Sequence, residues 1–349
     1  MDAQIALLLL QDGITNGAIY VLMALALVLV FAVTRIIFIP LGEFVAYGAL
    51  TLAALQAGTT PQTWGLLVVL AAIAAAIDSV AAVRRSVPGL PRELAGIVAR
   101  HGAMPLLSGL GLRFLPLERL ALPLQILLAL MIVVPLGPLV YRLAFERVAE
   151  ASVLFLLIVA VAVHLVLLGL GLFFFGAEGS RTPPFSEGGL ALGALSVPFQ
   201  ALWILGVAAA LIVALALFFG RTVYGKALRA TAINRVGARL MGIPTELAGR
   251  LTFALAALIG AFSGILVSPI TTIYYDTGFL VGLKGFVGAI LGALVSYPLA
   301  ALGALAVGVL ESFSSFYASS FKEVIVFTAI IPVLLWRSLR ARGAADDEA

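Results

Sequence analysis

The chain has 349 residues, of which 63% are apolar and only 11% are charged, with a formal net charge of +4. Soluble domains carry about a quarter charged residues and under half apolar ones, so this composition excludes a water-soluble globular protein. The sequence contains no cysteine, which also excludes a disulfide framework and cysteine-based metal or redox centres.

Long apolar runs predict an all-α, polytopic transmembrane bundle of about 8–10 spans, because about 20 apolar residues cross a hydrocarbon core of about 30 Å. The first run has no basic region before it, so we expect no cleavable signal and a retained first span. The short, Gly-rich run at 280–296 is typical of a half-helix or re-entrant segment. In chain order the predicted helices are Ile14–Val33, Ile36–Ala57, Trp64–Val83, Leu120–Tyr141, Val153–Phe175, Phe199–Phe219, Leu247–Ile273, Leu280–Ser296, Leu299–Phe316 and Val324–Trp336.

The distribution of basic residues predicts the orientation, because short cytoplasmic loops collect Lys and Arg. Residues 177–196 are nearly neutral and are expected outside. In the stretch 221–250 the only acid is Glu246. The basic residues that we place on the cytoplasmic side are Arg221, Lys226, Arg229, Arg235, Arg239 and Arg250, together with Arg337, Arg340 and Arg342 of the tail.

Residues 84–119 form another basic segment, interrupted by prolines and glycines. Its charge favours the cytoplasmic side, whereas counting spans back from Arg142 and Arg147 favours the opposite side. We interpret residues 78–120 as an amphipathic insertion that lies at the membrane interface. A plain charged linker is the alternative.

Constellations typical of enzymes are missing from the sequence. The stretch from Gly220 to Ala227 resembles a phosphate-binding loop, but Ala227 stands where a Ser or Thr must hold magnesium. The chain has two histidines, and His164 stands alone in an apolar run, which favours a packed helix residue over a metal ligand. We therefore expect that this chain does not hydrolyse ATP.

Charges inside apolar runs indicate function, because each costs several kcal/mol unless it faces a partner or water. Glu43 and Lys284 are the strongest candidates for a polar pathway, and an ion pair between them is one hypothesis. Glu311 and Asp276 fit helix ends at the interface equally well. Small residues at four-residue spacing predict close helix packing at Gly13 and Gly17, Gly260 and Gly264, and Gly288 and Gly292.

The segment from Val236 to Gly242, which reads VGARLMG, has small residues at positions 238 and 242 on what would be one helix face. Small side chains there predict a notch that receives a partner protein, and the flanking Arg235 and Arg239 would steer the encounter. A plain basic loop would explain the arginines but not the ordered small residues.

This segment resembles the loop by which ABC-importer permeases dock on their ATPase subunits, whose pattern is E-A-A-x-x-x-G. Other stretches resemble permeases of the branched-chain amino-acid (LivH/LivM) type: NGAIYVLMALALVLVFAVTRIIFIPLGEF near the start, GAEGSR, and GLKGFVGAILGALVSYPLAALGALAVGVLESF near the end. The similarity covers about residues 13–57 and 141–337, and residues 78–120 have no counterpart in it.

The resemblance implies that residues 1–349 form one transmembrane permease domain of a bacterial inner-membrane importer. The implied partners are a homologous second permease, two cytoplasmic ABC ATPases that use ATP and Mg, a periplasmic solute-binding protein and the lipid bilayer, with no nucleic acid. No cofactor is expected in this chain. The docking loop would be residues 220–250, with Val236, Gly237, Ala238 and Gly242 in contact. Gly42 and Glu43, and Lys284 and Phe286, stand where the family has its G-E and G-[LM]-K-x-F signatures.

Two departures weaken the expectation of a leucine-sized cargo. The family has Asn-Phe-Ala-His before Gly-Glu, where this chain has residues 38–41 as FIPL, and Gly-Gly is replaced by Gly292-Ala293. A more apolar or carboxylate-bearing solute is therefore an alternative. A stand-alone secondary transporter or channel, built on inverted repeats with broken helices, is the alternative function. An intramembrane enzyme is disfavoured, because no paired catalytic residues are visible.

Overall fold

Helices make up nearly all of the regular structure in the computed structural model, which describes residues 3–85, 89–192, 195–292, 294, 296–332 and 334–335. The helices of ten or more residues are α1 (Ala3–Thr34), α2 (Leu41–Gln56), α3 (Thr63–Arg84), α4 (Leu90–Phe114), α5 (Leu122–Val133), α7 (Val153–Phe175), α8 (Phe199–Arg221), α9 (Val223–Ile233), α11 (Thr245–Val267), α12 (Thr277–Leu291) and α13 (Tyr297–Tyr317). The shorter helical segments are η1 (Leu117–Arg119), α6 (Leu136–Val140), the π-helical turn η2 (Tyr141–Phe145), η3 (Glu146–Val148), α10 (Arg235–Leu240), η4 (Ser319–Phe321) and α14 (Lys322–Thr328). Strands β1 (Gly189–Leu192) and β2 (Leu195–Pro198) form an antiparallel hairpin, which the sequence did not predict.

Seven helical segments in the described part of the chain are long and apolar enough to cross a membrane, and α2 and α12 are two shorter apolar helices. Taken together they fall within the predicted eight to ten segments, and they confirm the all-α polytopic bundle. The seven are α1, the run from α5 to η3 (Leu122–Val148), α3, α7, α8, α11 and α13. Predicted residues Ala293, Trp336, Arg337, Arg340 and Arg342 lie outside the described residues.

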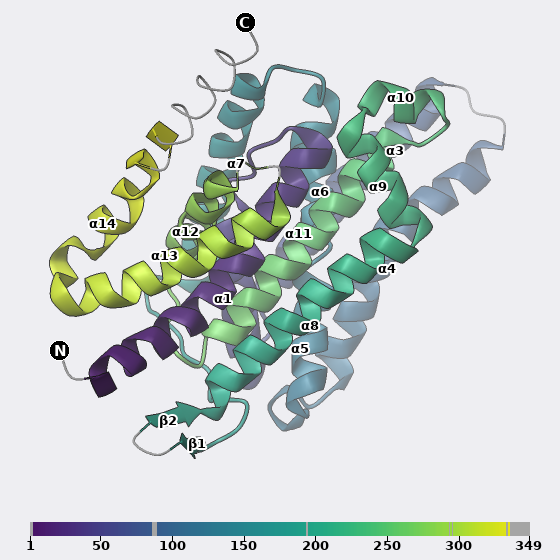
Figure 1. The fold of residues 1–349 in the computed structure, drawn as a ribbon. Helices are drawn as coiled ribbons and strands as arrows, with labels where there is room; N and C mark the ends of the chain where they lie inside the picture. The colour runs from purple at the N-terminus through teal and green to yellow at the C-terminus, as the bar shows by residue number, and fades with distance from the viewer. Residues whose placement is uncertain are drawn as a thin grey trace, which may run out of the picture.

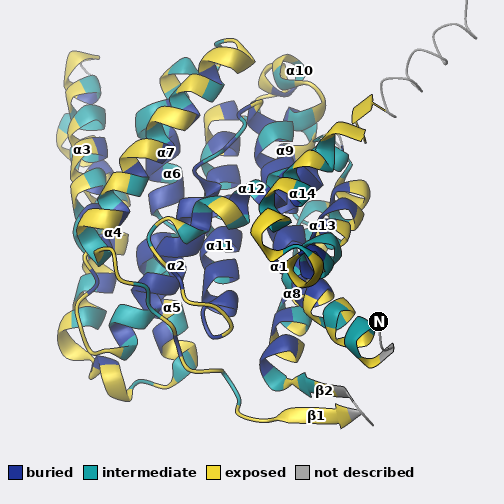
Figure 2. Cartoon of the chain, turned by 90° about the vertical axis from the view of Figure 1, so that its left-hand side faces the viewer, coloured by how far each residue is buried: buried dark blue, intermediate teal, exposed yellow. Residues whose placement is uncertain are grey.

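The two ends of the bundle differ in charge and in structure. The short helices α9 and α10, which carry Lys226, Arg229, Arg235 and Arg239, lie at one end, and the β1–β2 hairpin lies at the other (Figures 1 and 2). We call these the basic end and the hairpin end. Helix α1 has 32 residues, more than the about 20 that a bilayer requires, so the helix exceeds the thickness of the hydrocarbon core.

Helix α4 accounts for most of the segment interpreted as an insertion. Trp64 at the start of α3 donates a hydrogen bond to the carbonyl of Pro105 at 3.0 Å, and Asp78 near the end of α3 contacts His101 at 2.9 Å. Helix α4 therefore returns antiparallel along α3. This extra helix reconciles the two orientation signals of the sequence, because Arg84 and Arg142 can then lie at the same end of the bundle.

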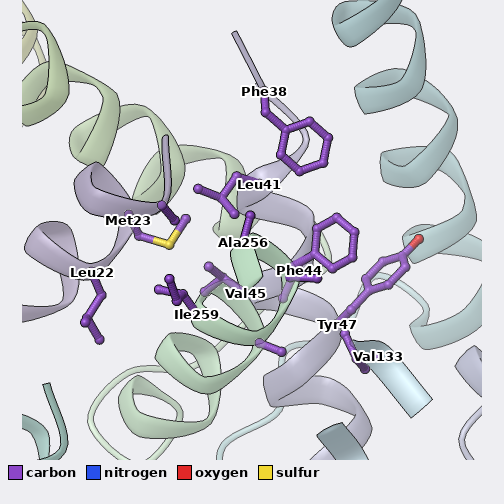
Figure 3. Packing of buried hydrophobic residues seen from close by; sticks show 14 of the residues in the cluster. Leu22, Met23, Phe38, Leu41, Phe44, Val45, Tyr47, Val133, Ala256 and Ile259 are labelled. Atoms are coloured by element: carbon purple, nitrogen blue, oxygen red, sulfur yellow. The ribbon is translucent and has the colours of Figure 1, made fainter. Parts of the chain in front are cut away.

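The core lies where α1, α2, α5, α6 and α11 meet. Figure 3 shows Val45 of α2 beside Ile259 of α11 in this core, with Phe38 and Phe44 nearby, whereas Tyr47 points to the other side of α2. The rings of Phe38 and Phe253 lie 4.5 Å apart between centroids, which adds an aromatic contact to the burial of apolar surface. Figure 2 shows α2 and α11 as the most continuously buried helices, whereas α3, α4, α7 and α8 expose one face.

Glycine pairs mediate the closest approaches between helices, as the spacing predicted. A Cβ atom placed on Gly13 would lie 2.7 Å from the Cα of Val309, so α1 and α13 touch through their backbones. The same holds for Gly260 and Gly264 against α2, and for Gly288 and Gly292 against α13. In lipid such contacts replace the hydrophobic driving force between helices.

Prolines explain two differences from the predicted helix boundaries. Residues 35–40 are not helical, and α2 begins at Leu41 instead of Ile36. A proline disfavours the helical conformation in the residue before it, so Pro40 prevents an earlier helix start. The predicted helix Leu120–Tyr141 is broken at Val134 and Pro135 into α5 and α6, since Pro135 cannot donate a backbone hydrogen bond.

Candidate functional site

Helix α2 begins inside the bundle, and this places Glu43 in the interior. The chain leaves α1 at Thr34 and returns through Ile36 and Phe38, both fully buried. Glu43 then lies in the first turn of α2, where the positive end of the helix dipole stabilises a carboxylate. Its side chain is only 1% exposed, so its charge needs a partner.

The partner of Glu43 is His164 of α7, not Lys284 as hypothesised. The Nδ1 atom of His164 lies 2.7 Å from Oε1 of Glu43, and the imidazole ring stacks on Phe279 of α12 at 4.6 Å between centroids. The second carboxylate oxygen of Glu43 is buried without a hydrogen-bond partner among the described residues. The histidine that stands alone in its apolar run is therefore hydrogen-bonded to a buried carboxyl group, and spacing along the chain held no signal of this contact.

Gly42 permits the close approach of α2 and α12. A side chain at Gly42 would collide with the backbone of Gly278, and Tyr47 one turn later donates a hydrogen bond to the carbonyl of Leu167 at 2.7 Å. Helix α2 is thus held by α12 on one side and by α7 on the other, with Glu43 between them. The predicted importance of the Gly42-Glu43 pair has this physical basis.

Lys284 of α12 belongs to a separate buried cluster. Its Nζ atom lies 2.5 Å from Oε1 of Glu311 on α13 and 3.1 Å from Oε1 of Glu323 on α14. The hydroxyl of Tyr20 donates to Oε2 of Glu311 at 2.5 Å. One cation therefore joins two carboxylates, and the cluster ties α12, α13 and α14 to α1. Glu311 is a member of this cluster and not a residue of a helix end, whereas Asp276 is exposed before α12.

Phe286 follows Lys284 on α12 and packs, partly buried, against the core. The structure thus separates the four predicted pathway residues into the Glu43–His164 pair with Gly42, and the Lys284 cluster with Phe286 on the same helix. Helix α12 connects the two groups, because it supplies both Phe279, which stacks on His164, and Lys284.

At the basic end, α9 and α10 form the predicted docking segment. Thr222 caps α9 by accepting a hydrogen bond from the amide of Gly225, so the stretch that resembled a phosphate-binding loop is a capped helix start. Asn234 caps α10 in the same way through the amide of Gly237. Three apolar side chains project from this segment, since Val236 is 71% exposed, Leu240 83% and Met241 82%.

The predicted notch between Ala238 and Gly242 is wrong. Helix α10 ends at Leu240, and Gly242 lies beyond it with a φ of 81°, a left-handed conformation that glycine adopts without strain. Gly242 therefore turns the chain toward α11 instead of extending a helix face. Ala238 is buried, so the side of α10 open to a partner is the apolar one and not the small-residue one.

Two arginines of this segment bind the residues that precede α7. Arg235 donates to the carbonyl of Ala149 at 3.0 Å, and Arg239 forms an ion pair with Glu150 at 2.8 Å. The Arg239 guanidinium holds the pKa of the Glu150 carboxyl below its usual range. Because Glu150 immediately precedes α7, α10 is linked to the helix that carries His164. The role of these arginines in steering a partner stays a prediction.

Seven helices that are long and apolar enough to cross a membrane, with ionisable side chains paired between them, are typical of a multi-pass membrane protein. The chain belongs to the family of the permease component of the branched-chain amino acid transport system, whose family model matches residues 9–335. These are bacterial ABC-importer permeases, which are not themselves catalytic.

Individual relatives are similar at moderate identity. The high-affinity branched-chain amino acid transport system permease protein BraD of Pseudomonas aeruginosa is 28% identical over 70% of this chain and 81% of its own. LivH of Salmonella typhimurium is 32% identical over 56% of this chain and 65% of its own. The autoinducer 2 import system permease protein LsrC of Yersinia enterocolitica is 35% identical over 24% of each chain. The solved structure PsaBC from Streptococcus pneumoniae covers 94% of this chain with a TM-score of 0.38 and 12% identity.

Proposed function

We propose that this chain is the membrane-spanning subunit of an ATP-driven importer for branched-chain amino acids or a related small amphipathic solute. ATP and Mg would be used by two separate ATPase subunits, and a second permease and a periplasmic solute-binding protein would complete the transporter. Family membership and the relatives' transport of branched-chain amino acids support this proposal.

The single observation that carries it is the exposed apolar surface of Val236, Leu240 and Met241 at the basic end. These side chains lie outside the seven candidate spans. Exposed apolar side chains gathered on a short segment are typical of a protein-interaction site. An ATPase subunit on the cytoplasmic side is the partner that the family implies for this surface.

The contacts of α10 also support a route from the ATPases to the interior. A movement of α10 would pull on Ala149 and Glu150 through Arg235 and Arg239, and so on the first turn of α7. Helix α7 carries His164, whose ring contacts Glu43 of α2. We propose that ATP-driven closure of the ATPases repositions α2 and α12 through this chain of contacts, as rigid elements and without covalent chemistry.

Co-purification tests the docking surface. The double variant Val236→Asp, Leu240→Asp should lose ATPase subunits that co-purify with the wild-type permease, because acids replace apolar contacts. Leu190→Asp, an equivalent change on the hairpin at the other end, should retain them. Undiminished ATPase attachment and uptake in the double variant would contradict the assignment of this surface.

The alternative, a stand-alone secondary transporter, has one observation in its favour. The short helices α2 and α12 meet near their N-terminal ends at Gly42 and Gly278, as broken helices of secondary transporters do. Solute uptake by the purified permease in ATP-free liposomes under an ion gradient would favour this alternative. Uptake that requires the ATPases and ATP favours the importer.

A further inference from the structure

A cavity of about 330 Å³ lies in the basic half of the bundle, between helix α4 and the helices α6 and α11. Its volume is at the lower end of the about 300–1,000 Å³ that is typical of small-molecule pockets. It is distinct from the two buried clusters described above and from the docking segment. Four basic side chains line it, namely Arg100 and His101 of α4, Arg142 of η2 and Arg250 of α11.

Two carboxylates hold three of these four basic side chains. Asp78 of α3 contacts Nε2 of His101 at 2.9 Å and also binds Arg142. Glu146 accepts a hydrogen bond from Arg142 at 2.6 Å and one from Arg250 at 2.8 Å.

The remaining donors of the cavity have no anion. Arg100 forms no ion pair within the described ranges of the chain. The Nε atom of Arg142 is buried and has no hydrogen-bond partner among the described residues. Buried polar groups nearly always have a partner, so this atom calls for an acceptor from outside the chain. The cavity therefore offers one unpaired guanidinium at its mouth and one unused donor inside it.

The mouth of the cavity opens among apolar side chains at bilayer depth. Arg100 is exposed there, and so are Met104 and Leu107, which follow it by four and seven residues and therefore share its face of α4. The neighbouring His101 contacts Asp78 inside the candidate span α3, so Arg100 lies alongside a membrane-spanning helix and not beyond its end. A charge at this depth is costly unless it meets a partner.

We propose that this cavity binds the head group of an anionic phospholipid. Its phosphodiester would lie between Arg100 and the free Nε atom of Arg142, and its acyl chains would run along Met104 and Leu107. Guanidinium donors match phosphate oxygens, and basic pockets between transmembrane helices are typical sites for anionic lipids. A zwitterionic head group would bring its own cation close to the arginines. Free phosphate would leave the apolar mouth without a contact.

The bound lipid would join α4 to the rest of the bundle. Arg142 and Arg250 belong to η2 and α11, so a head group on Arg100 and Arg142 adds to the contacts that hold α4 in place. Helix α4 lies in the segment that has no counterpart in the sequence resemblance. The inference is therefore independent of the proposed importer function and of the solute.

Lipid competition tests the chemistry of the site on the full chain, purified in a neutral maltoside detergent with any subunits that accompany it. The probe is dioleoylphosphatidylglycerol with a fluorescent acyl chain. Unlabelled dioleoylphosphatidylglycerol should displace it, and dioleoylphosphatidylcholine, which has the same chains, should compete about tenfold or more weakly. Inorganic phosphate should not displace it. Equal competition by the two lipids would mean that the chains alone bind, and displacement by phosphate would assign the site to a soluble anion; either result overturns the proposal.

Variants of exposed residues locate the site without breaking the buried ion pairs. Arg100→Gln should weaken binding of the labelled lipid about tenfold, because a charged hydrogen bond to the phosphate is lost. Arg92→Gln removes the same charge from the same helix outside the cavity and should bind as wild type.

A second pair of variants adds an acid in place of removing a base. Met104→Glu should weaken binding at least as much as Arg100→Gln, because the new carboxylate can pair with Arg100 one turn away and repels phosphate. Leu110→Glu places the same acid on an exposed site of α4 outside the cavity and should leave binding unchanged. Wild-type affinity in both Arg100→Gln and Met104→Glu, or equal losses in the two control variants, would rule out this cavity as the lipid site.

Discussion

The Nδ1 atom of His164 lies 2.7 Å from Oε1 of Glu43, so a side chain in the middle of α7 holds the first turn of α2. Both side chains are at most 10% exposed, which makes the pair a buried one. Removal of one member of a buried ion pair costs about 3–5 kcal/mol, because the remaining charge has no compensation.

We therefore expect His164→Ala to destabilise the permease by several kcal/mol and to abolish uptake. The double variant Glu43→Gln, His164→Gln, which leaves two neutral amides able to hydrogen-bond, should recover part of the stability. Thermal unfolding of the purified complex in detergent measures both effects, with Glu43→Gln and His164→Gln also measured singly. If the double variant unfolds at the temperature expected from adding the two single losses, the residues are not coupled.

A second prediction concerns the partners of Lys284. The exchange Lys284→Glu with Glu311→Lys should recover stability that either single variant loses, because the 2.5 Å pair is re-formed with reversed sign. The exchange Glu43→Lys with Lys284→Glu should give no such recovery, since these residues lie in different clusters. Melting temperatures of the three single and two double variants show which carboxylate is the partner of Lys284.

The same glycine-to-alanine substitution should affect stability differently at two positions, depending on the contacts of the glycine. Gly42→Ala should destabilise the protein, because its methyl group would overlap the backbone of Gly278 and force α2 and α12 apart. Gly169→Ala on α7 meets no atom within 4 Å and should be neutral or stabilising by about 0.5–1 kcal/mol, the helix preference of alanine. Expression level and melting temperature give the comparison.

Substitutions of Gly242, in the turn after α10, distinguish an effect on backbone conformation from a direct contact with the partner. Gly242→Val should weaken ATPase attachment, because a branched residue at a φ of 81° costs about 1–2 kcal/mol and would reorient α10. Gly242→Asn, which tolerates this conformation better, should behave nearly as wild type. The amount of ATPase that co-purifies with each variant is the measurement. Loss of attachment in both variants alike would mean that Gly242 itself contacts the partner.

A bulky residue inside the docking segment has a different expected effect. Ala238 is the buried residue of α10. The Ala238→Trp change should therefore displace the whole helix and break its ion pair with Glu150. ATP hydrolysis by attached subunits should then continue without coupled uptake. Parallel assays of hydrolysis and solute uptake in proteoliposomes test this, and coupled uptake at the wild-type level would refute it.

Sequence composition was sufficient to predict the membrane-spanning helices and the glycine contacts, because both depend on local patterns of about 20 residues or fewer. Sequence alone also singled out Glu43 and Lys284, since a charge in an apolar run needs a partner, and both side chains are buried and paired. Their actual partners, His164 and Glu311, could not be predicted, because pairing depends on how distant helices pack.

One further miss has a local physical cause. Gly242 was assigned to a helix face because its spacing from Ala238 is helical, but the helix ends first and the glycine serves the turn. The interpretation of residues 78–120 as an amphipathic insertion stays a prediction, and its packing on α3 could not be foreseen. The structure pairs His101 of this segment with Asp78 of α3, a contact that only the antiparallel packing of α3 and α4 creates.

The contacts at the two ends of the α7 segment from Val153 to His164 make it a lever. Its inner end is tethered to α10 through Glu150, and the Glu43–His164 pair lies eleven residues further along, roughly 16 Å at 1.5 Å per residue. A tilt of this segment at the basic end would displace the buried His164 side chain at its other end. With α10 as the proposed docking segment, the permease interior would respond to the angle at which the ATPases hold α10, and not only to whether they are bound.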